Sequence, residues 1–197
     1  RCTALRRFVV LEPIADEFIR CAIEETNRLE LGEPNASATF VGPMISKAAA
    51  ERVLSAIREA DYSGNDLLAG GSGFDAAGHS FVRPTLFRTN DWRTRIVQEE
   101  TFGPVAVIQI ARDIDHALEL ANGVEQGLIM SVCTSDEQAR DYLADRANVG
   151  VVSEGPGPVP VHPDAPFGGW KASGIGTPEH GIWDLSFYTR PQVRYRQ

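Results

Sequence analysis

The sequence contains few of the residues that build disulfide frameworks, metal sites and nucleic-acid interfaces. It has only three cysteines in 197 residues, at widely separated positions, and no cysteine–histidine spacing typical of a metal site. The odd, scattered cysteines indicate a reducing compartment, so we expect a cytoplasmic protein without a bound metal. Acidic residues outnumber basic ones by 27 to 19, which gives a formal net charge of −8. This balance, without any basic stripe, disfavours nucleic acid and anionic membranes as partners.

Long apolar runs are also missing, so the sequence predicts no membrane-spanning helix. The glycine cluster Gly70–Gly73 lacks the Gly-x-Gly-x-x-Gly order of a dinucleotide site, and no clear helix pattern follows it. We therefore expect a hairpin loop there rather than a phosphate site. Hydrophobic residues make up 43% of the chain and charged residues 23%, a globular balance in a chain long enough to bury a sizeable core.

Hydrophobic periodicity predicts strands that alternate with helices. The predicted strands are Phe8–Leu11, Asp66–Ala69, Ser80–Arg88 with an interruption at Pro84, Val105–Ile110, Leu128–Cys133 and Val149–Ser153. Four helices are predicted. The first begins at Pro13, and the second follows an N-cap at Ser46. The third runs from Asp113 to Gly127, and the fourth follows a capping box formed by Ser135 and Gln138. This succession indicates βαβ units and an α/β fold with a mostly parallel sheet and flanking helices.

Two of the three cysteines fall within these apolar patterns. Cys21 lies near the hydrophobic stripe of the first helix, and Cys133 lies inside a strand expected to be buried. Both are predicted to be inert core residues, because buried thiols behave as small hydrophobes. Cys2 lies outside both patterns.

The stretch Gln98–Val105 combines two carboxylates with an aromatic ring, a glycine and a proline just before a predicted strand. Taken alone, Glu99 and Glu100 suggest a solvated pair before a turn. The position favours a site, because ligands of α/β sheets gather on loops at strand ends. In an extended segment only one of the two carboxylates faces a ligand, and Phe102 shares the face of Glu100. We expect a platform for sugar hydroxyls beside a flat heterocycle.

Two further segments stand apart from the alternating pattern. Gly155–Gly176 is rich in glycine and proline, and a loop of this length with an aromatic end favours a functional role. The final run, Phe187–Gln197, is predicted to be a strand-like tail with aromatic and arginine side chains. We predict a domain over residues 1–186 and a tail over residues 187–197.

Several motifs occur in the order found in the NAD(P)-dependent aldehyde dehydrogenase superfamily, which the whole chain resembles. They are Arg1-Cys2-Thr3-Ala4 followed by Arg6-Arg7, Gly42-Pro43-Met44-Ile45, Glu99-Glu100-Thr101-Phe102-Gly103-Pro104, Ala121-Asn122 with Gly127-Leu128, and Pro166-Phe167-Gly168-Gly169-x-Lys171-x-Ser173-Gly174. One departure is local: the family often has an asparagine where this chain has Ser153-Glu154-Gly155.

The resemblance implies the thiol-bearing catalytic half of such an enzyme, with a Rossmann-like α/β sheet. The cofactor domain would belong to an upstream half of the same enzyme, so we do not expect this chain to oxidise aldehydes alone. A small-molecule aldehyde is the implied substrate, and NAD or NADP the implied cofactor. The family also implies a homo-oligomer, a dimer or a tetramer, in which Phe187–Gln197 packs against a neighbouring subunit.

The resemblance also assigns roles to single residues. Cys2 would be the catalytic nucleophile; without the motifs it would be interpreted as a buried structural thiol. Glu100 would bind the ribose of the nicotinamide half, and Phe102 would pack beside the nicotinamide, with ordinary core packing as its alternative. Phe167 would line the substrate tunnel, where Gly168 and Gly169 allow close backbone approach.

Two other functions stay open at this point. A thioester on the thiol can be passed to acceptors other than water, as in a CoA-acylating or phosphorylating reductase of the same architecture. The chain could also be a non-catalytic remnant that serves as a binding or oligomerisation module.

Overall fold

The computed structural model describes residues 2–155 and 161–196. The chain divides into two compact units, Arg1–Leu120 and Ala121–Gln197. The boundary predicted between residues 186 and 187 lies within the second unit, and it stays a prediction. No helix among the described residues is long and apolar enough to span a bilayer.

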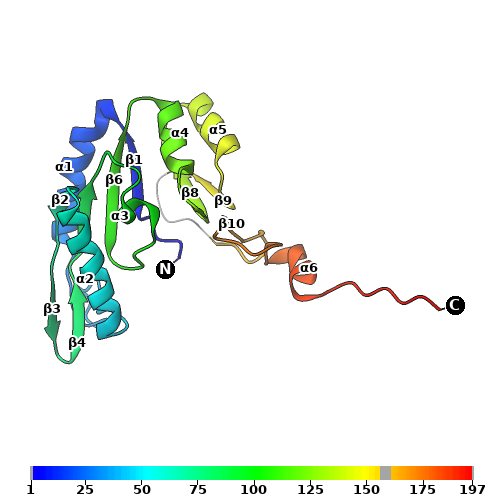
Figure 1. Ribbon diagram of the computed structural model, residues 1–197, viewed down its shortest axis with the longest axis horizontal. Coiled ribbons are helices and arrows are strands. Elements are labelled where there is room, and N and C mark those ends of the chain that lie inside the picture. Colours follow the sequence, from blue (N-terminus) through cyan, green and yellow to red (C-terminus); the bar gives the residue numbers. More distant parts are fainter. Residues whose placement is uncertain (1, 156–160, 197) are drawn as a thin grey trace. The chain divides into compact units, whose positions relative to one another are not determined.

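A four-stranded sheet forms the centre of the first unit (Figure 1). Its strand order is β1 (Arg7–Leu11), β6 (Val105–Ala111), β5 (Thr85–Arg88) and β2 (Asp66–Ala69). Strand β6 pairs in parallel with both β1 and β5, and only β2 runs antiparallel. The predicted α/β fold with a mostly parallel sheet is therefore confirmed.

Helix α1 (Glu12–Arg28) covers one face of this sheet, and Pro13 lies in its first turn, where proline is tolerated. Ala15 of α1 is buried with Val10, Leu86 and Ile108 of the sheet. The side chains of α1 that pack against this core are Phe18, Ile19, Ala22 and Ile23. Cys21 points elsewhere and is exposed, so the prediction of a core cysteine is wrong at this position.

Helix α2 (Lys47–Tyr62) begins as the sequence predicts. The hydroxyl of Ser46 accepts a hydrogen bond from the backbone N–H of Ala49 at 3.1 Å, which satisfies one free donor of the first turn. The predicted apolar face is buried, with Val53 and Ile57 almost fully enclosed. On the face of the sheet opposite Leu86 and Ile108, Phe87 and Val107 are equally buried. Short helix α3 (Arg95–Gln98) packs against α2 and ends just before the Glu99–Pro104 loop.

The strand predicted over Ser80–Arg88 divides at Pro84 into two strands of different sheets. β3 (Gly73–Ala76) and β4 (His79–Val82) form a hairpin, while β5 enters the central sheet. The glycine cluster is a loop, as predicted, but Gly70 and Gly71 connect β2 to β3 with positive φ. The hairpin turn lies at residues 77–78 instead.

The second unit contains a βαβ crossover, in which α5 (Glu137–Arg146) links the parallel strands β8 (Ile129–Val132) and β9 (Val151–Glu154). β7 (Gln126–Gly127) pairs antiparallel with β10 (Trp170–Lys171). A 3-10 turn, η1 (Gly181–Trp183), leads into α6 (Asp184–Tyr188).

Four local predictions in this part of the chain are wrong. The helix from residue 113 is α4 (Ile114–Asn122), which ends before Gly127 because that glycine lies in β7. Asp136 caps α5 in place of Ser135, because its carboxylate accepts from the N–H groups of Gln138 and Ala139.

The third and fourth corrections concern a cysteine and the tail. Cys133 follows β8 and is exposed, so it is not the buried strand residue that the apolar pattern predicts. In the tail, Phe187 and Tyr188 complete α6, and residues 189–196 form no strand. A strand needs a partner strand for its backbone groups, and no strand among the described residues pairs with this segment.

Candidate active site

The segment that carries Cys2 lies beside the start of strand β6. Cys2 is exposed in a turn, and the chain then runs through Arg6 into β1. The backbone carbonyl of Arg6 accepts a hydrogen bond from the N–H of Val107 at 2.9 Å. The thiol segment precedes β1 and the Glu99–Pro104 loop precedes β6, so the parallel pairing brings the two together. Ligands of open α/β sheets usually bind at the carboxyl ends of strands, whereas this site lies at the amino ends.

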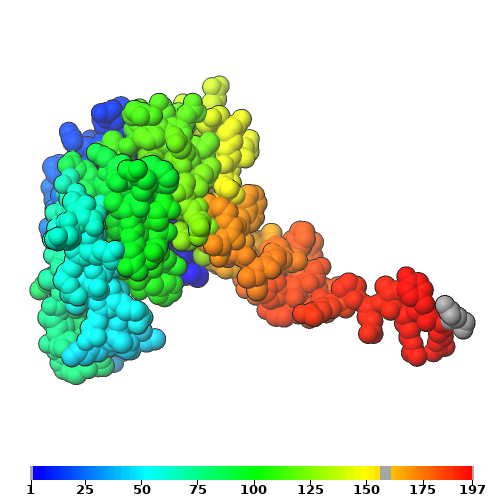
Figure 2. Space-filling model, viewed as in Figure 1, coloured from blue at the N-terminus to red at the C-terminus, as the bar shows by residue number. Residues whose placement is uncertain are grey.

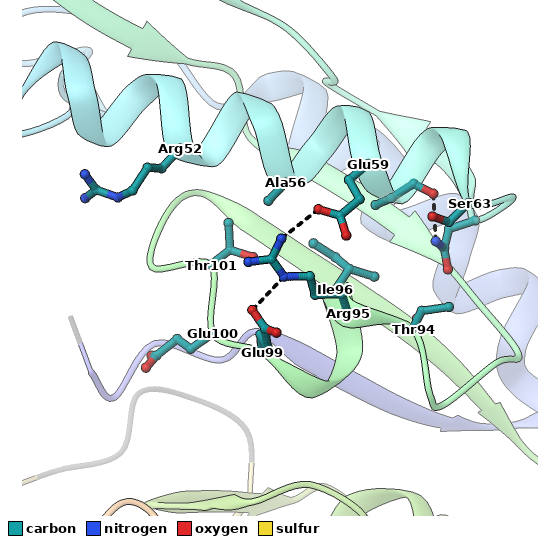
Figure 3. Close-up of a pocket in the computed structure, with 12 residues that line it drawn as sticks. Arg52, Ala56, Glu59, Ser63, Thr94, Arg95, Ile96, Glu99, Glu100 and Thr101 are labelled. Carbon is teal, nitrogen blue, oxygen red and sulfur yellow. Dashed lines mark hydrogen bonds and ion pairs between the residues drawn. The ribbon is translucent and has the colours of Figure 1, made fainter.

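The two adjacent glutamates have different surroundings. Glu99 forms an ion pair with Arg95, whose guanidinium also binds Glu59 of α2 at 2.8 Å (Figure 3). These hydrogen bonds, to Glu99 first and then to Glu59, raise the pKa of Arg95. Glu100 points away from Arg95 in the same view. The Glu99 side chain is thus held in an ion pair with Arg95, while the Glu100 side chain points in another direction. This agrees with the expectation that adjacent side chains of an extended segment point to opposite sides.

Glu100 and Phe102 line one cavity of about 320 Å³ together with Ala4, Leu5 and Arg6 of the thiol segment. Glu100 also borders a second cavity of about 240 Å³ between α2 and α3, which includes the Arg95 ion pairs. The cyan atoms of α2 and the green atoms of residues near 100 adjoin on the face shown in Figure 2. A carboxylate and an aromatic ring therefore border one hollow with the residues that follow Cys2.

Phe102 does not pack in the core. Its side chain is 65% exposed, so the core-packing alternative is wrong for the described chain. Its φ of 51° lies in the left-handed region, which non-glycine residues rarely adopt. Such strain is held by surrounding structure and concentrates at functional sites. The extended geometry assumed for Glu100–Phe102 thus ends at Phe102, although both residues line the same cavity.

Gly103 allows this loop to lie against α2. A Cβ atom there would lie 2.6 Å from a methyl group of Val53, whose side chain is fully enclosed and cannot move aside. Pro104 then accepts a hydrogen bond from the N–H of Thr85 at 2.8 Å, which joins the loop to β5. The glycine and proline of the motif therefore hold the loop in place, while Glu100 and Phe102 face the cavity.

The loop that contains Phe167 is held within the second unit by backbone and ring contacts. Phe167 exchanges two backbone hydrogen bonds with Glu179, and its ring stacks on that of His180 at 5.7 Å between centroids. Gly169 approaches the carbonyl of Ser173 so closely that a Cβ would lie 2.3 Å from it. Phe167 itself is half-buried.

Lys171 and Ser173 of the same motif hold the loop to its own unit. The Lys171 ammonium donates to the carbonyls of Asn122 and Val124, at 3.2 and 2.7 Å, near the end of α4. The Ser173 hydroxyl accepts from the N–H of Gly127 at 3.0 Å. Where the family often has an asparagine, Glu154 instead forms an ion pair with Arg140 at 3.4 Å.

Two arginines near Cys2 were not predicted to have roles. Arg6 donates to backbone carbonyls beside Glu100, and Arg7 donates to the Gln109 side chain and the Leu120 carbonyl. Burial, and next the neighbouring Arg6, lower the pKa of Arg7 to about 10. The adjacent pair Arg6-Arg7 is visible in the sequence as part of the first family motif. The neighbouring residues, however, do not show that the hydrogen-bond partners of these arginines lie about a hundred residues away.

The sequence model of the aldehyde dehydrogenase family matches residues 1–193. The chain belongs to the aldehyde dehydrogenase family.

Curated relatives and solved structures agree with this assignment. The 1-pyrroline-5-carboxylate dehydrogenase of Bacillus subtilis (strain 168) is 36% identical over an alignment that covers 98% of this chain and 38% of that protein. The relative of the same name from Anoxybacillus flavithermus is 35% identical and is covered to 35% of its length.

Among solved structures, HpcC from Thermus thermophilus superposes with a TM-score of 0.90 and 32% identity, covering 100% of this chain and 41% of that one. Betaine aldehyde dehydrogenase from Staphylococcus aureus, determined in complex with NAD+, has a TM-score of 0.90 and 30% identity, covering 98% of this chain and 40% of that one. The chain thus spans between 35% and 41% of the length of these four proteins.

Proposed function

We propose that this chain is the thiol-bearing catalytic part of an NAD(P)-dependent dehydrogenase that oxidises an aldehyde to a carboxylic acid. The observation that carries the proposal is the shared cavity. Glu100 and Phe102 line it together with Ala4, Leu5 and Arg6, which begin two residues after Cys2, although Cys2 itself is not among its lining residues. The full-length enzyme would contain this chain behind a cofactor-binding half. Its three exposed free thiols fit a reducing compartment such as the cytoplasm.

Cys2 would supply the covalent chemistry. Its thiolate attacks the aldehyde carbon to form a C–S bond, and the carbonyl oxygen becomes an alkoxide. NAD(P), held by Glu100 and Phe102, would supply the hydride acceptor, and loss of hydride from this carbon would convert the Cys2 thiohemiacetal into a thioester. Water then cleaves the C–S bond of the thioester, which releases the carboxylic acid and returns the thiol. A thiolate suits both steps, because it is a strong nucleophile and a fair leaving group.

Glu100 and Phe102 fit the ribose and nicotinamide of such a cofactor. The Glu100 carboxylate faces the cavity instead of Arg95, and its two oxygens can accept hydrogen bonds from both ribose hydroxyls. The exposed Phe102 ring offers a flat apolar surface beside it. Together they would set the position of the nicotinamide ring relative to the thiol segment. We also propose that Phe167 lines the path of the aldehyde.

Glu100→Gln is expected to slow hydride transfer about tenfold or more in the full-length enzyme. The change keeps the shape of the side chain but removes the charge that orients the ribose, a loss of about 1.5–3 kcal/mol. Single-turnover formation of NADH measures the step directly. Glu99→Gln is the matched control, because Glu99 binds Arg95, and it should leave the rate within about twofold. A normal rate for Glu100→Gln would make Glu100 an ordinary surface residue.

We further propose that residues 187–197 assemble the enzyme into a homo-oligomer. The side chains of Tyr188 and Tyr195 are 70% and 88% exposed, and tyrosine and arginine are enriched at interfaces. Backbone groups of residues 189–196 are free of strand pairing among the described residues, so the segment can add to the sheet edge of a neighbouring subunit.

Deleting residues 190–197 from the full-length enzyme is therefore expected to reduce its assembly to a smaller one. This deletion leaves α6 intact, because the helix ends at Tyr188 and its C-cap, Thr189, is kept. Light scattering after size exclusion gives the mass of the assembly. An assembly of unchanged mass would show that the tail is a frayed terminus with no role in oligomerisation.

A further inference from the structure

Arg6 contacts both flanks of the loop that carries Glu100 and Phe102. On the incoming side, its guanidinium donates to the carbonyls of Val97 and Glu99, at 3.1 and 2.9 Å. On the outgoing side, its own carbonyl accepts from the N–H of Val107 at 2.9 Å. A single residue, four positions after Cys2, thus joins the thiol segment to the chain before and after the loop.

The contact with Glu99 bears directly on Glu100. The Glu99 carbonyl belongs to the peptide group that links Glu99 to Glu100, so holding this oxygen sets the plane from which the Glu100 side chain departs. The partly buried guanidinium is also attracted to the Glu100 carboxylate. Burial lowers the pKa of Arg6, and the charge of Glu100 opposes this shift. The guanidinium is suited to the task, because the two N–H groups of its terminal nitrogen Nη1 donate to the two carbonyls.

We propose that Arg6 is a positioning residue for the dehydrogenase reaction: it holds Glu100 at a set place relative to the segment that carries Cys2. The inference rests on the proposed role of Glu100. Hydride transfer needs the reacting atoms within a few tenths of an ångström of their best positions, so a tie between the ribose carboxylate and the thiol segment affects the rate. Arg6 touches neither substrate nor cofactor in this role and acts through Glu100.

A double-mutant cycle in the full-length enzyme tests this role. Single-turnover NADH formation is expected to slow about three- to tenfold in Arg6→Gln and about tenfold or more in Glu100→Gln. The double variant should be no slower than Glu100→Gln alone, because Arg6 has nothing left to position. Arg6→Lys should recover part of the rate, since it keeps the charge and N–H donors but not the planar shape of the guanidinium.

Arg7→Gln is the control for a merely structural effect. Arg7 is the adjacent arginine, at the start of β1, and its guanidinium donates to the Gln109 side chain and the Leu120 carbonyl. We expect it to lower the melting temperature while the rate of hydride transfer in the folded enzyme stays within about twofold. If Arg7→Gln does not fold, hydrogen exchange on the 197-residue chain separates the effects. Arg6→Gln should then speed exchange at the amides of Gln98 and Glu99 without changing that of Ile57.

The outcomes distinguish this inference from the proposed function. An unchanged rate in Glu100→Gln would overturn the assignment of Glu100, and the inference about Arg6 with it. A slow Glu100→Gln beside a normal Arg6→Gln would overturn only the inference about Arg6. A double variant whose fold-decrease in rate equals the product of the two single decreases would also overturn the inference about Arg6, because it would show that Arg6 acts independently of Glu100.

Discussion

Cys2→Ala is expected to abolish aldehyde oxidation by the full-length enzyme, with a loss on the order of 10⁴-fold or more. Removing the sulfur removes the atom that forms the C–S bond, so neither the thiohemiacetal nor the thioester can form. Steady-state NADH production at saturating aldehyde measures the loss. A burst of NADH in single-turnover experiments should vanish as well, because the step that releases the hydride follows the attack by the thiolate.

Cys21→Ala and Cys133→Ala are the matched controls, and both should retain activity within about twofold. The three variants can be compared directly, because all three cysteines are exposed to solvent and differ in their position in the fold. Cys2 lies two residues before Ala4, which lines the cavity with Glu100 and Phe102, whereas Cys21 and Cys133 are distant in sequence from every residue of that lining. Alkylation followed by peptide mapping should find Cys2 labelled first, since the thiolate is the reactive form. Equal labelling of all three would remove the case for an activated thiol.

Gly150→Ala is expected to unfold the second unit, with a loss of stability of more than about 3 kcal/mol. A Cβ at this position would lie 1.7 Å from the carbonyl oxygen of Gly168 and 2.8 Å from its carbonyl carbon. These are backbone atoms of the Phe167 loop, so no side chain can rotate away from the clash. The strand that follows, β9, would have to separate from the loop, and the contacts around Phe167 would be lost with it.

Denaturant unfolding of the 197-residue chain measures this effect. Gly42→Ala is the control, because its φ is ordinary and the nearest atom to a new Cβ is 3.6 Å away, in Pro34. That change should be neutral or stabilise the chain by up to about 1 kcal/mol, since alanine restricts the unfolded state. A Gly150→Ala variant as stable as the unchanged protein would contradict the close packing of β9 on the Phe167 loop.

Local patterns in the sequence were sufficient for most of the elements and for the family. The helix over Lys47–Tyr62 follows from the Ser46 cap and from apolar side chains at helical spacing, and the strand Asp66–Ala69 was predicted with its observed bounds. The alternation of strands and helices predicted the mostly parallel sheet. The ordered motifs indicated the aldehyde dehydrogenase family, which the family comparison confirms. The roles of Cys2, Glu100, Phe102 and Phe167 rest on the same motifs and stay predictions.

The same local patterns failed where two structures were equally compatible with the sequence. Asp136 and the neighbouring serine can both cap a helix, and the backbone geometry selects the aspartate. Phe187 and Tyr188 favour a strand by composition, but a strand requires a partner strand. In α6 the rings pack edge to face, and Thr189 bonds back to the Leu185 carbonyl. Apolar neighbours predicted buried thiols at Cys21 and Cys133, although neighbours in sequence do not determine which side of an element faces the core.

By itself, the sequence determined the alternation of the main strands and helices, the face that α2 buries and the motifs that identify the family, because each depends on residues close together along the chain. Only the tertiary structure decided that the thiol segment lies beside the Glu99–Pro104 loop. That proximity comes from the parallel pairing of β1 with β6, which joins segments about a hundred residues apart. It also decided that Arg6 reaches Val97 and Glu99, and that Phe102 takes a strained backbone and an exposed ring. These features depend on non-local contacts, which no local spacing of residues encodes.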